Sequence, residues 1–250
     1  MPQDPTFYLF AIPAVLLIGF AKGGFSGLSA LAMPLIALGL DPIQGAAILL
    51  PILIVQDAVS VAAFRKSWDG YVLAVMLPGA VVGVVLGWWL AASVSSNGIL
   101  VSVGAISLVF GLYRLWAERG NRIAASSRSP AWVGTLFGVA TGFTSQIAHA
   151  GGPPFQMWVM PRKLPRDTFI GTTAIFFAAL NWIKVPAYAA LGQFTWPNAL
   201  ATAALLPFAI AGALGGVWLI RKVAPERFYT LVYALMVLAG AKLLWDGLGL

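Results

Sequence analysis

The 250-residue chain contains no cysteine, a single histidine and only eight acidic residues. The absence of cysteine excludes disulfides, thiol catalysis and cysteine-ligated metal sites. Charged residues form only 9% of the chain, hydrophobic residues form 60%, and the mean hydropathy is +0.89. A soluble core of this size could not bury so much apolar surface. The chain is therefore predicted to be an integral membrane protein, with the lipid bilayer as its surroundings.

The hydrophobic residues fall into runs separated by short polar segments. A bilayer is spanned by about 20 apolar residues, so most of the runs have the length of one transmembrane helix and two are too long. The N-terminal residues MPQDPTFY include no basic segment, and no cleavable signal peptide is expected. The runs cover about residues 7–39, 45–64, 71–93, 98–117, 131–160, 168–192, 197–220 and 228–249.

Both long runs are interrupted by glycine-rich polar residues at the same relative position. The first interruption is GFAKGGFSGLSALAMP at 19–34, and the second is GFTSQIAHAGGPPFQMWVMP at 142–161. Paired interrupted hydrophobic segments in two halves of a chain are the sequence sign of a transporter binding site. The likeness of the two halves continues in the pairs Gly45 and Gly171, Pro78 and Pro207, Gly83 and Gly212, Gly87 and Gly216, and Trp89 and Trp218. The chain is therefore predicted to be a duplicated unit.

The net charge of +7 reports membrane topology and not a nucleic-acid partner, because the basic residues lie at helix ends and form no dense patch. If each long run turns back as a hairpin, all four basic groups fall on one face; if each crosses once, the groups divide between both faces. The positive-inside bias favours two hairpins, a cytoplasmic basic face and both termini outside. The groups are Arg65/Lys66, Arg119/Arg122/Arg128, Arg162/Lys163/Arg166 and Arg221/Lys222/Arg227.

These crossings predict an all-α integral membrane protein built from two inverted repeats. Each repeat is a broken helical hairpin followed by three transmembrane helices, so the second repeat enters from the opposite face. The expected limits are about 6–117 and 131–250, with a linker at about 118–130, and residues 1–250 form a single transport domain. The hairpin tips, near 22–27 and 144–154, should approach each other inside the bilayer, where non-helical backbone must be buried in protein or line a cavity.

The two tips have the chemistry of a site for a small anion, with no metal and no cofactor. Lysine supplies a positive charge, glycines allow close backbone approach, and half-helix N-termini stabilise negative charge. The glycines would also suit close helix packing, which by itself does not account for a lysine at one tip and a histidine at the other. The candidate residues at the tips are Lys22, Gly23, Gly24, Ser26, Gln146, His149, Gly151 and Gly152.

Two ionisable residues lie well inside predicted spans, where charge is costly and functional by default. The repeat alignment places Asp57 opposite Ile183, next to Lys184, so one expectation is an ion pair between Asp57 and Lys184 across the pseudo-twofold axis. A second is that Lys184 and Asn181 face the substrate while Asp57, with Gln56, modulates it. A third is that Asp57, in place of a bound anion or a water-filled cavity, compensates the charge of Lys22. An inside-negative potential contributes about 2.3 kcal/mol per charge per 100 mV to anion export, so uniport by alternating access is expected. Asp57 is the candidate for proton coupling otherwise.

The motif GFAKGGFSGLSALAMP, the following DPIQGAAILLPILIVQD and the AGGPP of the second half resemble the TauE/SafE family of sulfite and organosulfonate exporters. The resemblance covers essentially the whole chain. It implies a bacterial inner-membrane carrier, not an enzyme, that exports sulfite, sulfoacetate or related organosulfonates. The family's glycine-rich motifs map onto Gly23, Gly24, Gly27, Gly151 and Gly152. A homodimer is compatible with this reading but is not specified by it.

Two other classes of function remain open at this stage. One is a carrier or channel for another small anion. The other is an intramembrane serine protease, since GFSG at 24–27 and AHAGG at 148–152 resemble rhomboid motifs in which His149 would activate Ser26. The wide separation of the two motifs and their equivalent places in a duplicated unit argue against the protease.

The hairpin topology can be tested in this cysteine-free chain by single cysteine substitutions, one for each basic group. All four sites should be protected from an impermeant thiol reagent on intact cells, because they share the cytoplasmic face. Labelling at position 162 alone would show that the second long run crosses once and would contradict the inverted repeats. The substitutions are Arg65→Cys, Arg122→Cys, Arg162→Cys and Arg221→Cys.

Overall fold

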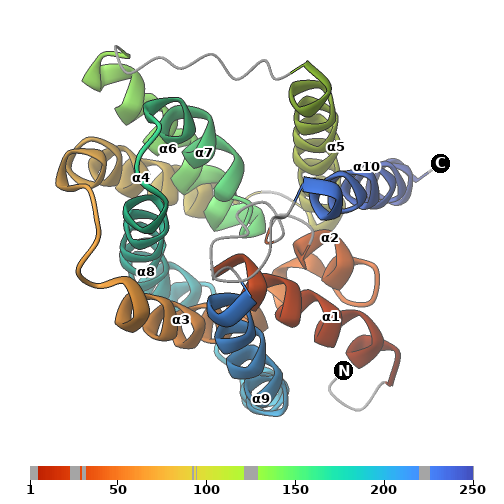
Figure 1. Cartoon of the computed structure of the whole chain (residues 1–250). Coiled ribbons are helices and arrows are strands. Elements are labelled where there is room, and N and C mark those ends of the chain that lie inside the picture. Colours follow the sequence, from red (N-terminus) through yellow and green to blue (C-terminus); the bar gives the residue numbers. More distant parts are fainter. Residues whose placement is uncertain are drawn as a thin grey trace.

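The structure is a computed structural model that describes residues 5–22, 29, 32–91, 93, 95–120, 129–219 and 226–249 (Figure 1). Over those residues it contains helices and connecting turns and no strand, which confirms the predicted all-α class. The helices are α1 (Pro5–Lys22), α2 (Ala32–Ala37), α3 (Pro42–Phe64), α4 (Gly70–Ala91), α5 (Ser96–Gly120), α6 (Ala131–Ala148), α7 (Gly152–Val159), the 3-10 helix η2 (Met160–Arg162), α8 (Arg166–Ala190), α9 (Trp196–Leu219) and α10 (Glu226–Leu248).

Four of the described helices are long and apolar enough to cross a membrane: Ile43–Phe64 in α3, Gly70–Leu90 in α4, Arg166–Ala190 in α8 and Trp196–Leu219 in α9. Large apolar side chains on these helices also face outward, including Trp89 at 70% and Trp218 at 58% exposure. Such a surface is unfavourable in water and suits lipid. The protein is a multi-pass membrane protein.

The helix ends follow local sequence signals. The Asp41 carboxylate accepts hydrogen bonds from the N–H groups of Ile43 and Gln44, at 3.0 and 3.2 Å, and Pro42 supplies the first turn of α3. This is a helix N-cap followed by a preorganised proline. Just after the C-terminus of α8, Gly192 adopts φ +67°, a left-handed conformation that glycine accepts without strain.

Both long runs are broken helices, as the sequence predicts. The first run ends its long helix at Lys22 and begins its short helix at Ala32; the second ends at Ala148 and resumes at Gly152. In each run the long helix has 18 residues and the short helix packs against it, α2 on α1 and α7 on α6. The predicted tip residues Gly23, Gly24, Ser26 and Gly27 lie outside the described residues.

The helices of the two halves pack reciprocally. Helix α1 packs against α9, and its counterpart α6 packs against α4, the counterpart of α9. Two further close pairs, α3 with α8 and α5 with α10, join equivalent helices of the two halves, and α3 also packs on α9; α5 and α10 lie together along one side of the molecule (Figure 1). Each long broken helix therefore makes its most extensive helix contact with a helix of the other half.

Glycines make these crossings close. A Cβ atom built on Gly142 of α6 would collide with the backbone oxygen of Ala80 in α4. Its counterpart Gly19 of α1 meets the backbone of Gly212 in α9, 2.5 Å from where its Cβ would lie. Small residues let helix backbones approach in membranes, where association depends on close packing. The paired glycines of the sequence are thus paired contacts of the fold.

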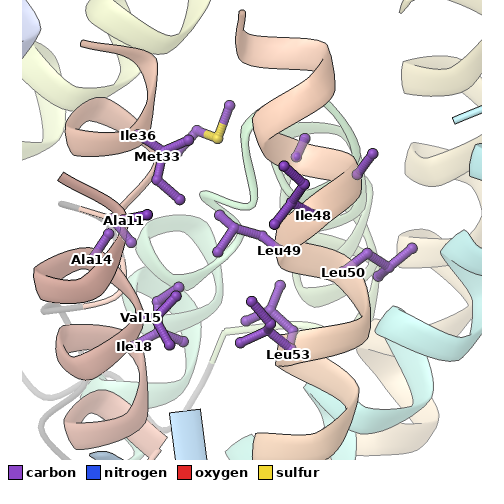
Figure 2. Close-up of a cluster of buried hydrophobic side chains, with 14 of the residues drawn as sticks. Ala11, Ala14, Val15, Ile18, Met33, Ile36, Ile48, Leu49, Leu50 and Leu53 are labelled. Carbon is purple, nitrogen blue, oxygen red and sulfur yellow. The ribbon is translucent and has the colours of Figure 1, made fainter. Parts of the chain in front are cut away.

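Behind the first break lies an apolar cluster formed by α1, α2 and α3 (Figure 2). The side chains of Val15 and Ile18 from α1 and Met33 from α2 approach Leu49 and Leu53 of α3, and all five are at least 94% buried. A core packed this tightly resists shifts in the position of its helices. The cluster therefore fixes the end of α1, one turn beyond Ile18.

We expect Gly142→Ala to lower the melting temperature of the purified protein, because its methyl group must displace the α4 backbone at a cost of about 1–3 kcal/mol. The matched control is Gly215→Ala in α9, where the added Cβ would meet only the ring of Phe20, at 3.2 Å. That variant should be close to neutral, since alanine is favoured over glycine in helices by up to about 1 kcal/mol. Equal melting temperatures for the two variants would contradict the packing role of Gly142.

Candidate functional site

The two helix breaks line one cavity of about 60 Å³. A single water needs about 10–15 Å³ on this measure, so the space suits a ligand of a few heavy atoms. Its walls are mostly apolar, and no carboxylate is among the described residues that line it. The polar lining residues are Lys22 and Ser29 from the first break, Ser145, His149 and Gln156 from the second, and Thr173 and Asn181 from α8.

Lys22 is the last residue of α1, and its ammonium group forms an ion pair with the Asp57 carboxylate of α3. The two side chains are 11% and 2% exposed, and the ammonium also lies 5.6 Å from the ring centroid of Phe177. A cation at a helix C-terminus is favoured by the helix dipole, and one over an aromatic ring by the ring quadrupole. Lys22 is thus held at the cavity by Asp57, by Phe177 and by the dipole of its own helix.

The expected ion pair between Asp57 and Lys184 is not what the structure contains. Asp57 uses one oxygen for Lys22 and the other for Asn181, whose side-chain nitrogen donates to it over 2.6 Å. Asn181 is one turn before Lys184 on α8, so Asn181 occupies the position facing Asp57 and Lys184 is turned toward the second break. The repeat alignment predicted correctly which turns of α8 lie at the level of Asp57. It did not predict which residue of those turns points toward Asp57.

Lys184 is fully buried and bonded to the second break. Its ammonium nitrogen lies 2.7 Å from Nδ1 of His149, 3.2 Å from Oγ of Ser145 and 3.3 Å from the Ser145 backbone oxygen. The other ring nitrogen of His149, Nε2, lies 2.8 Å from the backbone oxygen of Ala46. That carbonyl can only accept, so Nε2 carries the hydrogen and Nδ1 accepts from Lys184.

His149 is held by its backbone as well as by its ring. It ends α6 in the left-handed conformation, with φ 49° and ψ 22°, which costs a non-glycine residue about 1–3 kcal/mol and is concentrated at functional sites. Its ring stacks on Tyr188 at 5.9 Å, and the Tyr188 hydroxyl donates to the backbone oxygen of Gln146. With both ring nitrogens bonded, the imidazole is not free to act as a base for Ser26, which lies outside the described residues.

The other predicted site residues lie behind the cavity wall. Gln56 is buried and donates from Nε2 to the backbone oxygens of Val15 and Ala209, which ties α3 to α1 and α9. Gln146 is buried against Gly87 of α4, and Gly151 packs on α6; neither lines the cavity. Of the predicted binding residues, Lys22, His149, Gly152 and Asn181 line it, and Lys184 stands directly behind His149.

The start of α7 offers fewer backbone amides than the sequence suggested. Helix α7 begins at Gly152, but the next two residues are Pro153 and Pro154, which have no N–H group. The N–H of Phe155 is already bonded to the backbone oxygen of Gly151, at 3.3 Å. In this first turn only Gly152 can offer a free amide, and the amides of the first break at 23–28 lie outside the described residues.

Gln156 is a polar lining residue that the sequence analysis missed. It is 4% exposed, its Oε1 has no hydrogen-bond partner within the described part of the chain, and a Cβ built on Gly152 would lie 3.6 Å from its Nε2 and from Oγ of Ser29. A buried carbonyl oxygen without a partner is costly unless a donor from a ligand or a water completes its bonding, and the Nε2 group of the same amide can donate to a ligand. One feature of the sequence could have identified Gln156: it is a single amide side chain in an otherwise apolar helix, one turn after Gly152.

A multi-pass helical protein whose two broken helices converge on a small cavity, mostly apolar but with a few polar side chains, has the architecture of a membrane transporter. The chain belongs to the family described as sulfite exporter TauE/SafE, which matches residues 11–243 and confirms the resemblance seen in the sequence. Members of this family are transporters of sulfite and related anions, and not enzymes. A search of curated proteins gave no match, and a search of solved structures gave none.

The ion pair at the cavity predicts a specific pattern of stabilities. Lys22→Ala leaves the buried Asp57 carboxylate without its cation, which should cost about 3–5 kcal/mol and lower the melting temperature. The double variant Lys22→Ala, Asp57→Asn removes the unpaired charge and should recover most of that loss. Thermal unfolding of the purified proteins measures both effects.

The matched control for this experiment is Lys242→Ala, which breaks the ion pair between Lys242 and Asp246 on α10. Those side chains are 58% and 39% exposed, so this variant should change stability by no more than about 1 kcal/mol. If Lys22→Ala has the same melting temperature as the wild type, the buried ion pair does not stabilise the protein and the prediction is wrong.

Proposed function

We propose that the chain exports small sulfur oxyanions, such as sulfite, sulfoacetate or related organosulfonates, and that the cavity between the two helix breaks is the substrate site. The observation that carries this proposal is the shared cavity, lined by a lysine at one break and a histidine at the other, with no carboxylate among its described lining residues. A bound anion would meet a cation and neutral donors and no opposing charge. Family membership supports the same substrate class.

The substrate would be bound by a few named groups. Lys22 supplies the charge, and Asn181, Gln156, Ser145 and Ser29 offer side-chain donors at the cavity wall. Because Asp57 already partners Lys22 from outside the cavity lining, the lysine stays compensated when the site is empty. An arriving anion then shares the ammonium with Asp57, so Lys22 has a negatively charged partner in both the empty and the occupied state.

The remaining lining is apolar and includes Leu53, Phe155, Phe169, Ile170 and Phe177. Such a wall contributes little to a sulfate-like ion, which is strongly hydrated, and favours an anion with a short alkyl group through burial of apolar surface. The apolar wall therefore favours small organosulfonates over sulfate, whereas sulfite, which has no alkyl group, is proposed from family membership.

We infer that transport proceeds by alternating access of two inverted repeats, in a bacterial inner membrane, with the site at mid-membrane. The reciprocal packing of α1 with α9 and of α6 with α4 supports this, because an operation that superposes one repeat on the other also converts the first helix pair into the second. Rocking one half against the other would open the cavity to either face in turn, as in other carriers with inverted repeats.

The proposal is tested by the flux of a panel of anions from proteoliposomes. Sulfite and short organosulfonates should move faster than sulfate or simple carboxylates, and cationic amines should not move. The same anions should raise the melting temperature through mass action on the folded state, whereas amines should not. Amine flux, or stabilisation by amines alone, would contradict the anion site.

Gln156→Leu removes the Nε2 donor of this side chain from the cavity wall and should reduce organosulfonate flux about tenfold, the effect of losing roughly one hydrogen bond to a charged group. The matched control is Gln193→Leu in the turn after α8, where the amide donates only to the backbone oxygen of Leu191. The control should keep wild-type flux. Equal flux in both variants would remove Gln156 from the site.

A further inference from the structure

Lys184 is a buried cation with no anion of its own. It is 0% exposed, and among the described residues no carboxylate lies within ion-pair distance of it. Its three contacts are neutral: the two oxygens of Ser145 and Nδ1 of His149. Three acceptors match the three N–H groups of an ammonium, so the geometry is ready for the charged form while the surroundings do not compensate its charge.

The pair formed by Lys184 and His149 has room for one exchangeable proton. Nε2 of His149 must keep its hydrogen, because it donates to the backbone oxygen of Ala46. A second proton on Nδ1 would point at the lysine nitrogen only 2.7 Å away. That arrangement is unfavourable when the lysine is charged, so the pair holds one exchangeable proton, and it resides on the lysine because an amine is more basic than an imidazole.

Few other titratable groups face this pair. Helix α3, which packs on α8, carries only Asp57, and α4 carries only Tyr71 at its start. Lys22 comes from α1, Tyr188 from α8 itself, and α6, α7 and α9 contribute no titratable residue. Asp57 and Lys22 compensate each other, and the Tyr188 hydroxyl is bonded to Gln146. The missing negative charge must come from elsewhere.

The cavity is where that charge would be supplied. Ser145 and His149 line it and also bind Lys184, so an anion in the cavity is separated from the lysine by these two side chains alone. Because Lys184 is fully buried, an anion next to these two side chains favours the charged lysine more strongly than it would in water. Conversely, a charged lysine there strengthens anion binding by the same factor, because such linkage is reciprocal.

We propose that the Lys184–His149 pair is a proton-binding site, and that an anion binds in the cavity together with a proton taken up from solvent onto the Lys184 nitrogen. This rests on the proposed function of the cavity. A monovalent anion and its proton then form a neutral unit, so the concentration gradients of the anion and of the proton, and not the membrane potential, drive their transport. In this proposal Lys184 carries the proton, and Asp57 remains bonded to Lys22 and Asn181.

The test is calorimetric titration of the purified protein with methanesulfonate, an anion that has no proton to gain near neutral pH, unlike sulfite. Titrations in two buffers of different ionisation enthalpy give the number of protons taken up per anion. The wild type should take up close to one proton, and its affinity should fall by up to about tenfold for each pH unit above the point where the empty pair loses its proton.

Two variants locate the proton. Lys184→Met should bind methanesulfonate without proton uptake and about tenfold or more weakly, whereas the exposed control Lys242→Met should behave as the wild type. If Lys184→Met does not fold, Lys184→Arg provides the same information, because its permanent charge should allow binding without proton uptake.

Each outcome decides between the two proposals. Binding by the wild type with no proton uptake overturns the proton site and leaves the anion site intact. Proton uptake that persists in Lys184→Met or Lys184→Arg places the proton on another group and also overturns this assignment. No binding of methanesulfonate, sulfite or sulfoacetate to the folded wild type overturns the anion site itself.

Discussion

The buried ion pair between Lys22 and Asp57 is the interaction on which the site depends. Neither charge could remain alone in an environment that water does not reach, and each is placed at the cavity only because the other is there. Asn181 occupies the second carboxylate oxygen, so the pair joins the end of α1 to the middle of α3 and of α8. Three helices that are distant in sequence are thereby fixed around one point.

Glycine makes that convergence sterically feasible. The α1 backbone approaches α9 at Gly19 and Gly212, and the α6 backbone approaches α4 at Gly142. In lipid there is no hydrophobic force to pull helices together, so close contact of small residues takes its place. Each broken helix is consequently held by the opposite half of the chain, and a movement of one half would carry the break of the other with it. This is the mechanical connection that an alternating-access carrier needs.

The two lysines of the site are placed in different electrostatic situations. Lys22 is partnered by a carboxylate outside the cavity lining, whereas Lys184 is surrounded by neutral acceptors on the second break. One is therefore compensated in the empty protein and the other is not. If Lys22 is always charged and Lys184 is charged only when an anion is bound, the site can bind an anion without a permanent excess of buried charge.

Local signals made much of this protein readable from its sequence. Composition specified a membrane protein, glycines and prolines specified where the two long helices break, and the motif around Lys22 specified the family. These features depend on residues close together in the chain. Lys22, His149, Gly152 and Asn181 were likewise found from their chemistry and depth.

The partners within the site were decided by the tertiary structure. Asp57 binds a lysine 35 positions away and an asparagine 124 positions away, and not the lysine that the repeat alignment placed beside it. Gln156 became a lining residue, and two prolines removed the amides expected at the start of α7. Sequence periodicity gives the depth of a residue along a helix, but the rotation of that helix is set by packing with helices far away in the chain. Which side chains meet in the cavity therefore follows from the packing and not from the order of residues.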